Sequence, residues 1–207
     1  MRETDICVQS SFGHTIKNRL LAQEPRAEAL AVLFPGGNGT CDIPLLHYAR
    51  KVALQAACDV LSIEYGYVRT EHSLSWEMHD ALLQEARQAV EACDLPKYRR
   101  IYFISKSLGT LIAGELAEKL RPAPICSLYL TPLEGTVAHI EKSGGIVVTG
   151  DQDRLFPDAS ILQTIPGIDL HVFAGANHSL EVPNDYHKSL ELLTRVADIC
   201  HRFLRAD

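Results

Sequence analysis

Residues 101–110 read Ile-Tyr-Phe-Ile-Ser-Lys-Ser-Leu-Gly-Thr and join two different hydrophobic patterns. The first four residues are apolar at every position, which is typical of a parallel strand covered on both faces. The residues from 108 to 120 instead have the spacing of a helix. Between the two lies Ser107, with the small residues Ser105 and Gly109 on either side, as a tight strand-to-helix turn requires. The alternative interpretation is a serine that merely caps an ordinary helix.

The same alternation of strand and helix continues in both directions along the chain. Strands are expected at 29–34, 60–63, 101–104, 125–130, 146–149 and 170–173, after an N-terminal hairpin of two short strands over 6–20. Helices are expected at 44–57, 76–93, 108–120 and from about 185 with Asn184 as N-cap, with weaker ones near 137–142 and 159–165. Strands that alternate with helices form right-handed βαβ units. The sequence therefore predicts one α/β domain, residues 1–207, built on a mostly parallel twisted sheet with helices on both faces.

Composition and charge exclude several classes of protein. The chain has 207 residues, of which 46% are hydrophobic and 22% charged, as in an ordinary globular domain. A net charge of −6 argues against a nucleic-acid partner. No apolar run reaches the roughly 18 residues of a membrane span, and the first residues lack the apolar core of a signal peptide, so we expect a cytoplasmic protein with no membrane partner. The six scattered cysteines have no zinc-type spacing, which favours reduced, mostly buried thiols and neither a metal nor a cofactor.

Chemistry-bearing residues follow the predicted strands. The carboxyl ends of parallel strands meet at one edge of a sheet, where sites of such proteins form. Ser107 follows one strand, Asp151 and Asp153 follow another, and His178 follows the last one. A serine hydroxyl needs a base to become a nucleophile, and a histidine base needs an acid to orient it. The alternatives without a catalytic role are a solvated loop histidine and aspartates that cap the next segment.

Four segments carry a family resemblance: Phe34-Pro35-Gly36-Gly37, Ser105-Lys106-Ser107-Leu108-Gly109, Gly150-Asp151-Gln152-Asp153 and Asn177-His178-Ser179-Leu180-Glu181. On these segments the chain resembles the α/β-hydrolase superfamily over nearly its whole length, in particular small, lidless, bacterial-type serine hydrolases. The resemblance implies a nucleophile elbow at Ser107, with His178 as the base. It also selects Asp153 over Asp151 as the acid, because Gly150 and Asp153 have the Gly-x-x-Asp spacing of the family.

The resemblance further implies an oxyanion hole formed by the backbone N–H groups of Leu108 and Gly37, with Asn38 as the neighbouring candidate. Glycines around this loop allow the backbone to approach a ligand closely. A plain glycine turn is the alternative. A Walker phosphate loop is excluded because no Gly-Lys-[Ser/Thr] follows, and the dinucleotide fingerprint fails because Asp42 stands where the third glycine belongs.

Further residues are expected around a substrate pocket. Asn38, Tyr65 and Lys106 lie in loops at the expected edge of the sheet, and Lys106 either attracts anionic substrates or is simply solvated. Trp76 opens a predicted helix and is interpreted as a packing anchor. Ser105 replaces the first glycine of the family's elbow, and Pro35 replaces a histidine that many members carry before the oxyanion glycine.

The sequence thus predicts a serine hydrolase that cleaves a small carboxylic ester or thioester through an acyl-enzyme on Ser107, while peptidase and C–C hydrolase chemistry stay open. The alternative function is a non-catalytic α/β-hydrolase scaffold that binds a small ligand or a protein partner. The expected partner is a small-molecule acyl substrate, and a homodimer is compatible with the sequence. Because residues 65–75 and 131–143 are too short for a large lid, we expect an open, shallow site.

Overall fold

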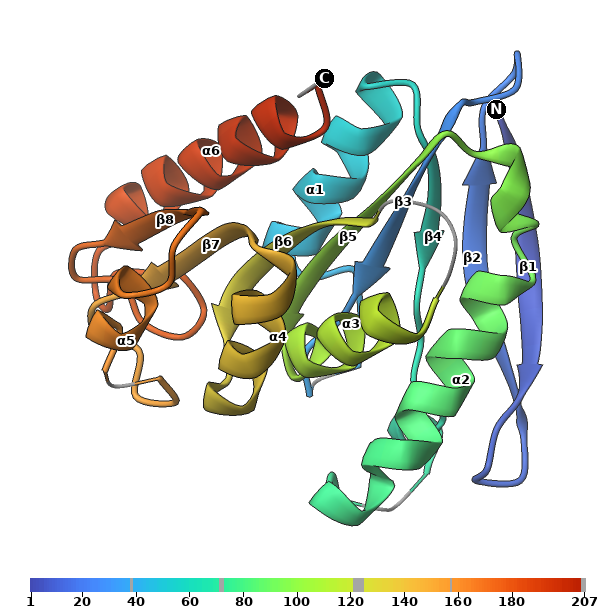
Figure 1. The fold of residues 1–207 in the computed structure, drawn as a ribbon, viewed down its shortest axis with the longest axis horizontal. Coiled ribbons are helices and arrows are strands. Elements are labelled where there is room, and N and C mark those ends of the chain that lie inside the picture. The colour runs from blue at the N-terminus through green and yellow to red at the C-terminus, as the bar shows by residue number, and fades with distance from the viewer. Residues whose placement is uncertain (38, 71–72, 121–124, 157, 206–207) are drawn as a thin grey trace.

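The apolar runs lie side by side in one eight-stranded sheet with the order β1-β2-β4-β3-β5-β6-β7-β8 (Figure 1). The computed structural model describes residues 1–37, 39–70, 73–120, 125–156 and 158–205. The strands are β1 Arg2–Gln9, β2 Thr15–Ala22, β3 Ala29–Phe34, β4 Asp59–Ser62, β5 Arg100–Ser107, β6 Ile125–Pro132, β7 Gly145–Gly150 and β8 Ile168–Phe173. Strands β3 to β8 run parallel, and only β1 and β2 are antiparallel to their neighbours. The expected mostly parallel sheet with an N-terminal hairpin is confirmed.

Helices cover both faces of the sheet, as predicted. They are α1 Pro44–Gln55, α2 His79–Glu91, α3 Leu108–Lys119, α4 Val137–Ser143, α5 Ser160–Gln163 and α6 Tyr186–Phe203, with short 3₁₀ turns η1 Gly66–Arg69, η2 Trp76–Met78, η3 Leu95–Lys97 and η4 Glu134–Thr136. Successive side chains of a strand point to opposite faces. In β3, Ala31 and Leu33 therefore pack with α1 and α6, whereas Leu30, Val32 and Phe34 pack with α2 and α3. This double coverage explains why β3 is apolar at every position.

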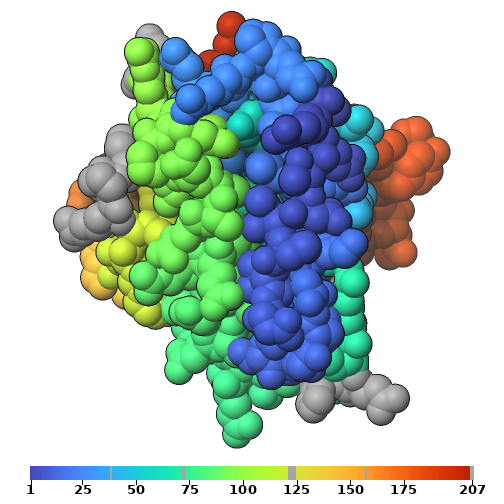
Figure 2. All heavy atoms as spheres, turned by 90° about the vertical axis from the view of Figure 1, so that its right-hand side faces the viewer, coloured from blue at the N-terminus to red at the C-terminus, as the bar shows by residue number. Residues whose placement is uncertain are grey.

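The N-terminal hairpin extends the sheet beyond β4 and lies beside α2. Figure 2 shows residues of the hairpin and of α2 running side by side across this face of the molecule. A buried carboxylate joins them: Glu85 of α2 accepts hydrogen bonds from the Ser10 hydroxyl at 2.7 Å and from the Gly66 amide at 2.9 Å. The turn of the hairpin is thereby tied to the segment that follows β4.

The start of the last helix differs from the prediction. Asp185, not Asn184, is the N-cap of α6, because its side chain accepts a hydrogen bond from the Lys188 amide at 3.0 Å. Asn184 precedes the cap with a φ of 62°, a left-handed conformation that asparagine tolerates better than most residues.

The chain between β6 and β7 holds only η4 and α4, so no large lid is inserted there. Across the part of the chain that the structure describes, no helix combines the length and the apolar character needed to cross a membrane. All six cysteines carry free thiols: Cys41, Cys58, Cys93 and Cys200 are buried, whereas Cys7 and Cys126 are exposed. Burial raises the pKa of the Cys58 thiol to about 11.

Candidate active site

The turn between β5 and α3 places Ser107 in a strained backbone conformation. Its φ of 52° lies in the left-handed region that non-glycine residues seldom adopt. Gly109 has to be glycine here, because a Cβ atom on it would lie 2.5 Å from the carbonyl oxygens of Phe34 and Pro35. Ser105 fits at the other end of the turn, where its buried hydroxyl donates to the Leu128 carbonyl at 3.3 Å. The chain therefore makes a tight strand-to-helix turn at Ser107, with Ser105 in place of the first glycine.

The structure brings Ser107, His178 and Asp153 together from three separate loops. The Nε2 atom of His178 lies 2.8 Å from the Oγ atom of Ser107. The Nδ1 atom of the same ring lies 2.8 Å and 2.9 Å from the two carboxylate oxygens of Asp153. The arrangement has the order needed for a proton relay, with a hydroxyl, a base and a group that orients the base.

Asp153 is held as an ionised group within the protein. Its side chain is fully buried, and burial by itself raises the pKa of the carboxyl group. The hydrogen bonds from His178 and from the Leu155 amide, the latter 2.9 Å long, outweigh burial and lower the pKa of Asp153. Asp151, the other candidate acid, is exposed, and its carboxylate accepts the Gly175 amide at 2.7 Å. Of the two aspartates, Asp153 is the one that contacts His178.

The loop that carries His178 is fixed from several sides. The side chain of Asn177 accepts the Ser179 amide at 2.8 Å, which closes a tight turn around the histidine. The Gln152 amide donates to the Ala176 carbonyl at 3.0 Å and joins this loop to the turn after β7. The Lys106 ammonium donates to the His178 carbonyl at 3.3 Å.

The two predicted oxyanion donors flank Ser107. Leu108 is the first residue of α3, where the first N–H groups of a helix have no partner within the helix. Gly37 lies in the loop after β3, and its carbonyl accepts the hydroxyl of Tyr67, which fixes the loop. Both residues line the same pocket as Ser107. Asn38, the neighbouring candidate, lies outside the described residues.

A pocket of about 700 Å³ opens beside Ser107. Its walls are mainly apolar, and the segments before α2 and after β6 supply much of them. The lining residues are Gly37, Leu74, Ser75, Trp76, His79, Leu82, Ser107, Leu108, Leu133, Glu134, Gly135 and Leu155. The two short segments that were expected to leave the site shallow therefore form walls around it, and the pocket is large enough for a small organic molecule.

Neither a protein-family model nor a curated protein matches the sequence at a significant level. Solved structures, however, match it over almost their whole length. ATU1826 from Agrobacterium tumefaciens, a protein of unknown function suggested to be an α/β hydrolase, has a TM-score of 0.76 at 17% identity, with 97% of this chain and 96% of that chain covered. XC6422 from Xanthomonas campestris, an α/β serine hydrolase without a lid, has a TM-score of 0.70 at 16% identity, with 99% and 96% covered. A dienelactone hydrolase from Anabaena variabilis has a TM-score of 0.74 at 17% identity, with 98% and 96% covered.

The chain has the α/β-hydrolase fold. The resemblance that four short segments indicate is thereby confirmed at the level of the fold. Within this α/β-hydrolase fold, Ser107 is the last residue of β5, and Asp153 and His178 lie in the turns after β7 and β8. All three residues lie at the carboxyl edge of the parallel strands, where sites of such sheets form.

Two residues expected in the pocket lie elsewhere, so this part of the prediction is wrong. Tyr65 is only 1% exposed and packs in the core with Tyr67, their ring centroids 6.3 Å apart. Lys106 is also buried, and it is not among the residues that line the pocket. Its ammonium instead contacts the backbone carbonyl of His178. The idea that Lys106 attracts anionic substrates therefore has no support.

Trp76 and His79 line the pocket, although sequence reasoning did not assign either of them to it. Trp76 is not the expected packing anchor, because it is 71% exposed and lies in η2, ahead of α2. The signal that could have found both residues is their place at the helix start that follows β4, since that end of the helix meets the carboxyl edge of the sheet.

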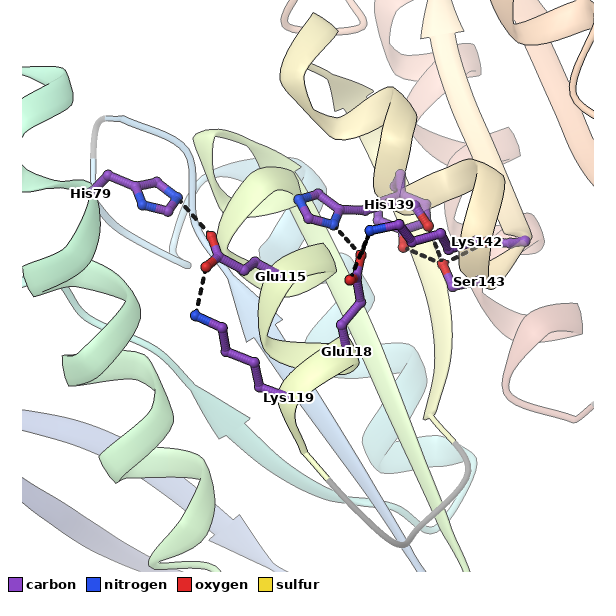
Figure 3. A network of polar contacts seen from close by, with 9 residues as sticks. His79, Glu115, Glu118, Lys119, His139, Lys142 and Ser143 are labelled. Carbon is purple, nitrogen blue, oxygen red and sulfur yellow. Dashed lines mark hydrogen bonds and ion pairs between the residues drawn. The ribbon is translucent and has the colours of Figure 1, made fainter.

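Polar contacts hold α3 between α2 and α4 (Figure 3). The Nε2 atom of His79 lies 3.2 Å from the carboxylate of Glu115 on α3. On the other side, Glu118 of α3 pairs with His139 and with the Lys142 ammonium at 3.0 Å. The helix that begins directly after Ser107 is thus braced from both flanks. No cluster of three or more His, Cys, Asp or Glu side chains able to hold a metal ion occurs among the described residues.

Proposed function

We propose that this protein is a serine hydrolase that cleaves a small carboxylic ester or thioester through an acyl-enzyme on Ser107. The observation that carries the proposal is the chain of contacts from the Ser107 hydroxyl to the His178 imidazole and on to the buried Asp153 carboxylate, each 2.8 Å at its shortest. A serine activated in this way is a nucleophile suited to acyl transfer. The hydrolase and dienelactone hydrolase with the same fold add support by analogy.

The proposed reaction has two halves. In the first, the Oγ atom of Ser107 attacks the acyl carbonyl carbon while Nε2 of His178 takes its proton. The negative charge that forms on the carbonyl oxygen is stabilised by the N–H groups of Gly37 and Leu108, each typically worth about 10²–10³-fold in rate. The imidazolium then gives its proton to the departing alkoxide or thiolate as the carbonyl–leaving-group bond breaks.

In the second half, water resolves the acyl-enzyme. His178 takes a proton from the water as its oxygen attacks the ester carbonyl, and then returns the proton to Oγ of Ser107 as the carboxylic acid leaves. Asp153 keeps the proton on the far nitrogen of the imidazole and stabilises the imidazolium in both halves. No other co-reactant is needed.

The pocket favours an uncharged organic group in the substrate. Six of its lining side chains are leucines or tryptophan, and the ionisable groups among its lining residues are His79 and Glu134. Burial of apolar substrate surface against such walls is favourable at about 25 cal/mol per Å². A negatively charged substrate would gain no lysine or arginine contact from these residues.

A fluorophosphonate probe tests the proposal. The folded wild-type protein is expected to become labelled on Ser107 and to hydrolyse p-nitrophenyl acetate, whereas Ser107→Ala loses both properties. Absence of labelling and turnover in the folded wild type, under conditions where a reference esterase reacts, would refute the proposal. A series of p-nitrophenyl esters with graded acyl chains then gives the preferred size of the acyl group.

A further inference from the structure

Lys106 is buried although it carries an ammonium group. It is only 8% exposed, whereas lysine is almost never buried without a partner, since a charge that leaves water loses its hydration. Contact with a substrate does not explain this burial, because the residue lies outside the pocket lining. Its side chain instead reaches the main chain of the proposed base: Nζ donates to the carbonyl oxygen of His178 at 3.3 Å.

The surroundings of Lys106 contain the charges that a buried ammonium needs. Burial lowers the pKa of Lys106, while the nearby carboxylates of Asp153 and Glu181 act in the opposite direction. A positive charge is thus enclosed near the carboxylates of Asp153 and Glu181. The three side chains come from β5, from the turn after β7 and from the loop after β8, so the ammonium also links parts of the site.

The hydrogen bond of Lys106 connects the strand of the proposed nucleophile directly to the proposed base. Lys106 is the residue directly before Ser107, and its partner is the backbone of His178 itself. The strand β5 shifts register against β6 between Lys106 and Ser107, so the backbone changes course at this point. The loop of His178 also closes on itself, with the Leu180 amide bonded to the Asn177 carbonyl at 2.9 Å, and is tied to the turn after β7 by the bond from Gln152 to Ala176. Misplacement of a reacting group by about 1 Å can cost a factor of about 10² in rate.

Building on the proposed function, we propose that Lys106 is a positioning residue, whose ammonium fixes the backbone of His178 to the strand of Ser107. The ammonium lies near the carboxylates of Asp153, from the turn after β7, and Glu181, from the histidine's own loop. Loss of the ammonium removes the hydrogen bond that ties the His178 backbone to β5.

Three substitutions separate the hydrogen bond from the charge. Lys106→Met removes both at similar length, Lys106→Gln keeps a donor without the charge, and Lys106→Arg keeps the charge. Lys142→Met is the matched control, because Lys142 forms an exposed ion pair on α4, away from the pocket. Rates are expressed per active site, counted with the fluorophosphonate probe, so that unfolded protein does not enter the comparison.

Lys106→Met is expected to lower kcat for p-nitrophenyl acetate about 10- to 100-fold with little change in KM. Lys106→Gln and Lys106→Arg keep a donor and should recover part of the rate. Lys142→Met should match the wild type in both kcat and KM. Wild-type kcat in Lys106→Met would overturn the proposal.

A second readout keeps the inference separate from the proposed function. The NMR chemical shifts of His178, compared in wild type and Lys106→Met, are expected to change in the variant whether or not the protein turns over an ester. If the wild type proves inactive but these shifts change, the proposed function fails and the positioning role of Lys106 stands. Unchanged His178 shifts in folded Lys106→Met contradict that role.

Discussion

The exchange of Asp153 for asparagine tests the site with the smallest change in shape. Asp153 accepts the Nδ1–H of His178 and the Leu155 amide, and its side chain is fully buried. An amide oxygen can keep the bond to Leu155, but the amide NH₂ then faces the histidine ring. The imidazole has to accept at Nδ1 and carry its proton on Nε2, where it can no longer take a proton from Ser107.

The expected loss is large and specific. In serine proteases the equivalent exchange lowers kcat about 10⁴-fold, which corresponds to about 5 kcal/mol of transition-state stabilisation. We therefore expect Asp153→Asn to reduce kcat for p-nitrophenyl acetate by about this factor and to slow fluorophosphonate labelling. Asp151→Asn is the control: its carboxylate contacts the Gly175 amide, so it should retain turnover close to the wild type.

The same variant has a signature in stability against pH. Because its contacts hold the pKa of Asp153 below its ordinary value despite burial, the ionised carboxylate stabilises the fold. That contribution is fully present above the unfolded-state pKa of about 3.9 and is lost as the pH falls through the lowered native value. Asp153→Asn should therefore lose less stability than the wild type on acidification into that range, as urea unfolding can measure. Full activity in Asp153→Asn together with an inactive Asp151→Asn would refute the reasoning.

Three further outcomes follow from the fold and the pocket. Trp76→Ala should leave the thermal midpoint of unfolding within about 2 °C of the wild type, since surface changes usually stay within about 0.5 kcal/mol. The same variant should have a higher KM for p-nitrophenyl esters with larger acyl groups. An unchanged KM across the series contradicts the place of Trp76 in the pocket. Gly109→Ala should lower the free energy of unfolding, measured in urea, by about 1–3 kcal/mol or more. Gly135→Ala should lower it much less, because the added Cβ has ordinary contacts of 3.5 Å. Equal losses in the two variants would argue against the tight turn at Gly109. A thiol reagent at pH 8 should react quickly with Cys7 and Cys126, and with the remaining thiols only after denaturation. Rapid reaction of all six cysteines in the native protein would contradict the burial of the other four.

The strands and the relative places of Ser107, Asp153 and His178 could be predicted from the sequence because short stretches of sequence determine them. Apolar runs covered on both faces identify parallel strands, and the ends of such strands meet at one edge. The order of the three residues along the chain then brings them to neighbouring turns. Their contacts follow from that topology, whereas their catalytic roles stay a proposal.

The pocket could not be predicted in the same way, because its walls depend on where loop side chains point. Tyr65 follows a strand, as a pocket residue does, yet the chain turns it into the core. Lys106 is separated from Ser107 by one peptide bond, yet its side chain is buried outside the pocket lining and contacts the His178 carbonyl. Trp76 lies in a helical pattern, but the turn before α2 leaves it exposed at the pocket. Each of these outcomes depends on tertiary packing that a window of sequence does not contain.

The central claim is that Ser107 carries the acyl group during turnover. The most direct measurement is rapid acid quenching of the wild-type protein during hydrolysis of p-nitrophenyl acetate, followed by mass spectrometry of its peptides. One acetyl group on Ser107, formed as fast as the first equivalent of p-nitrophenol and absent in Ser107→Ala, is the predicted result. Turnover without acetylation of Ser107, or undiminished turnover by Ser107→Ala, would contradict it.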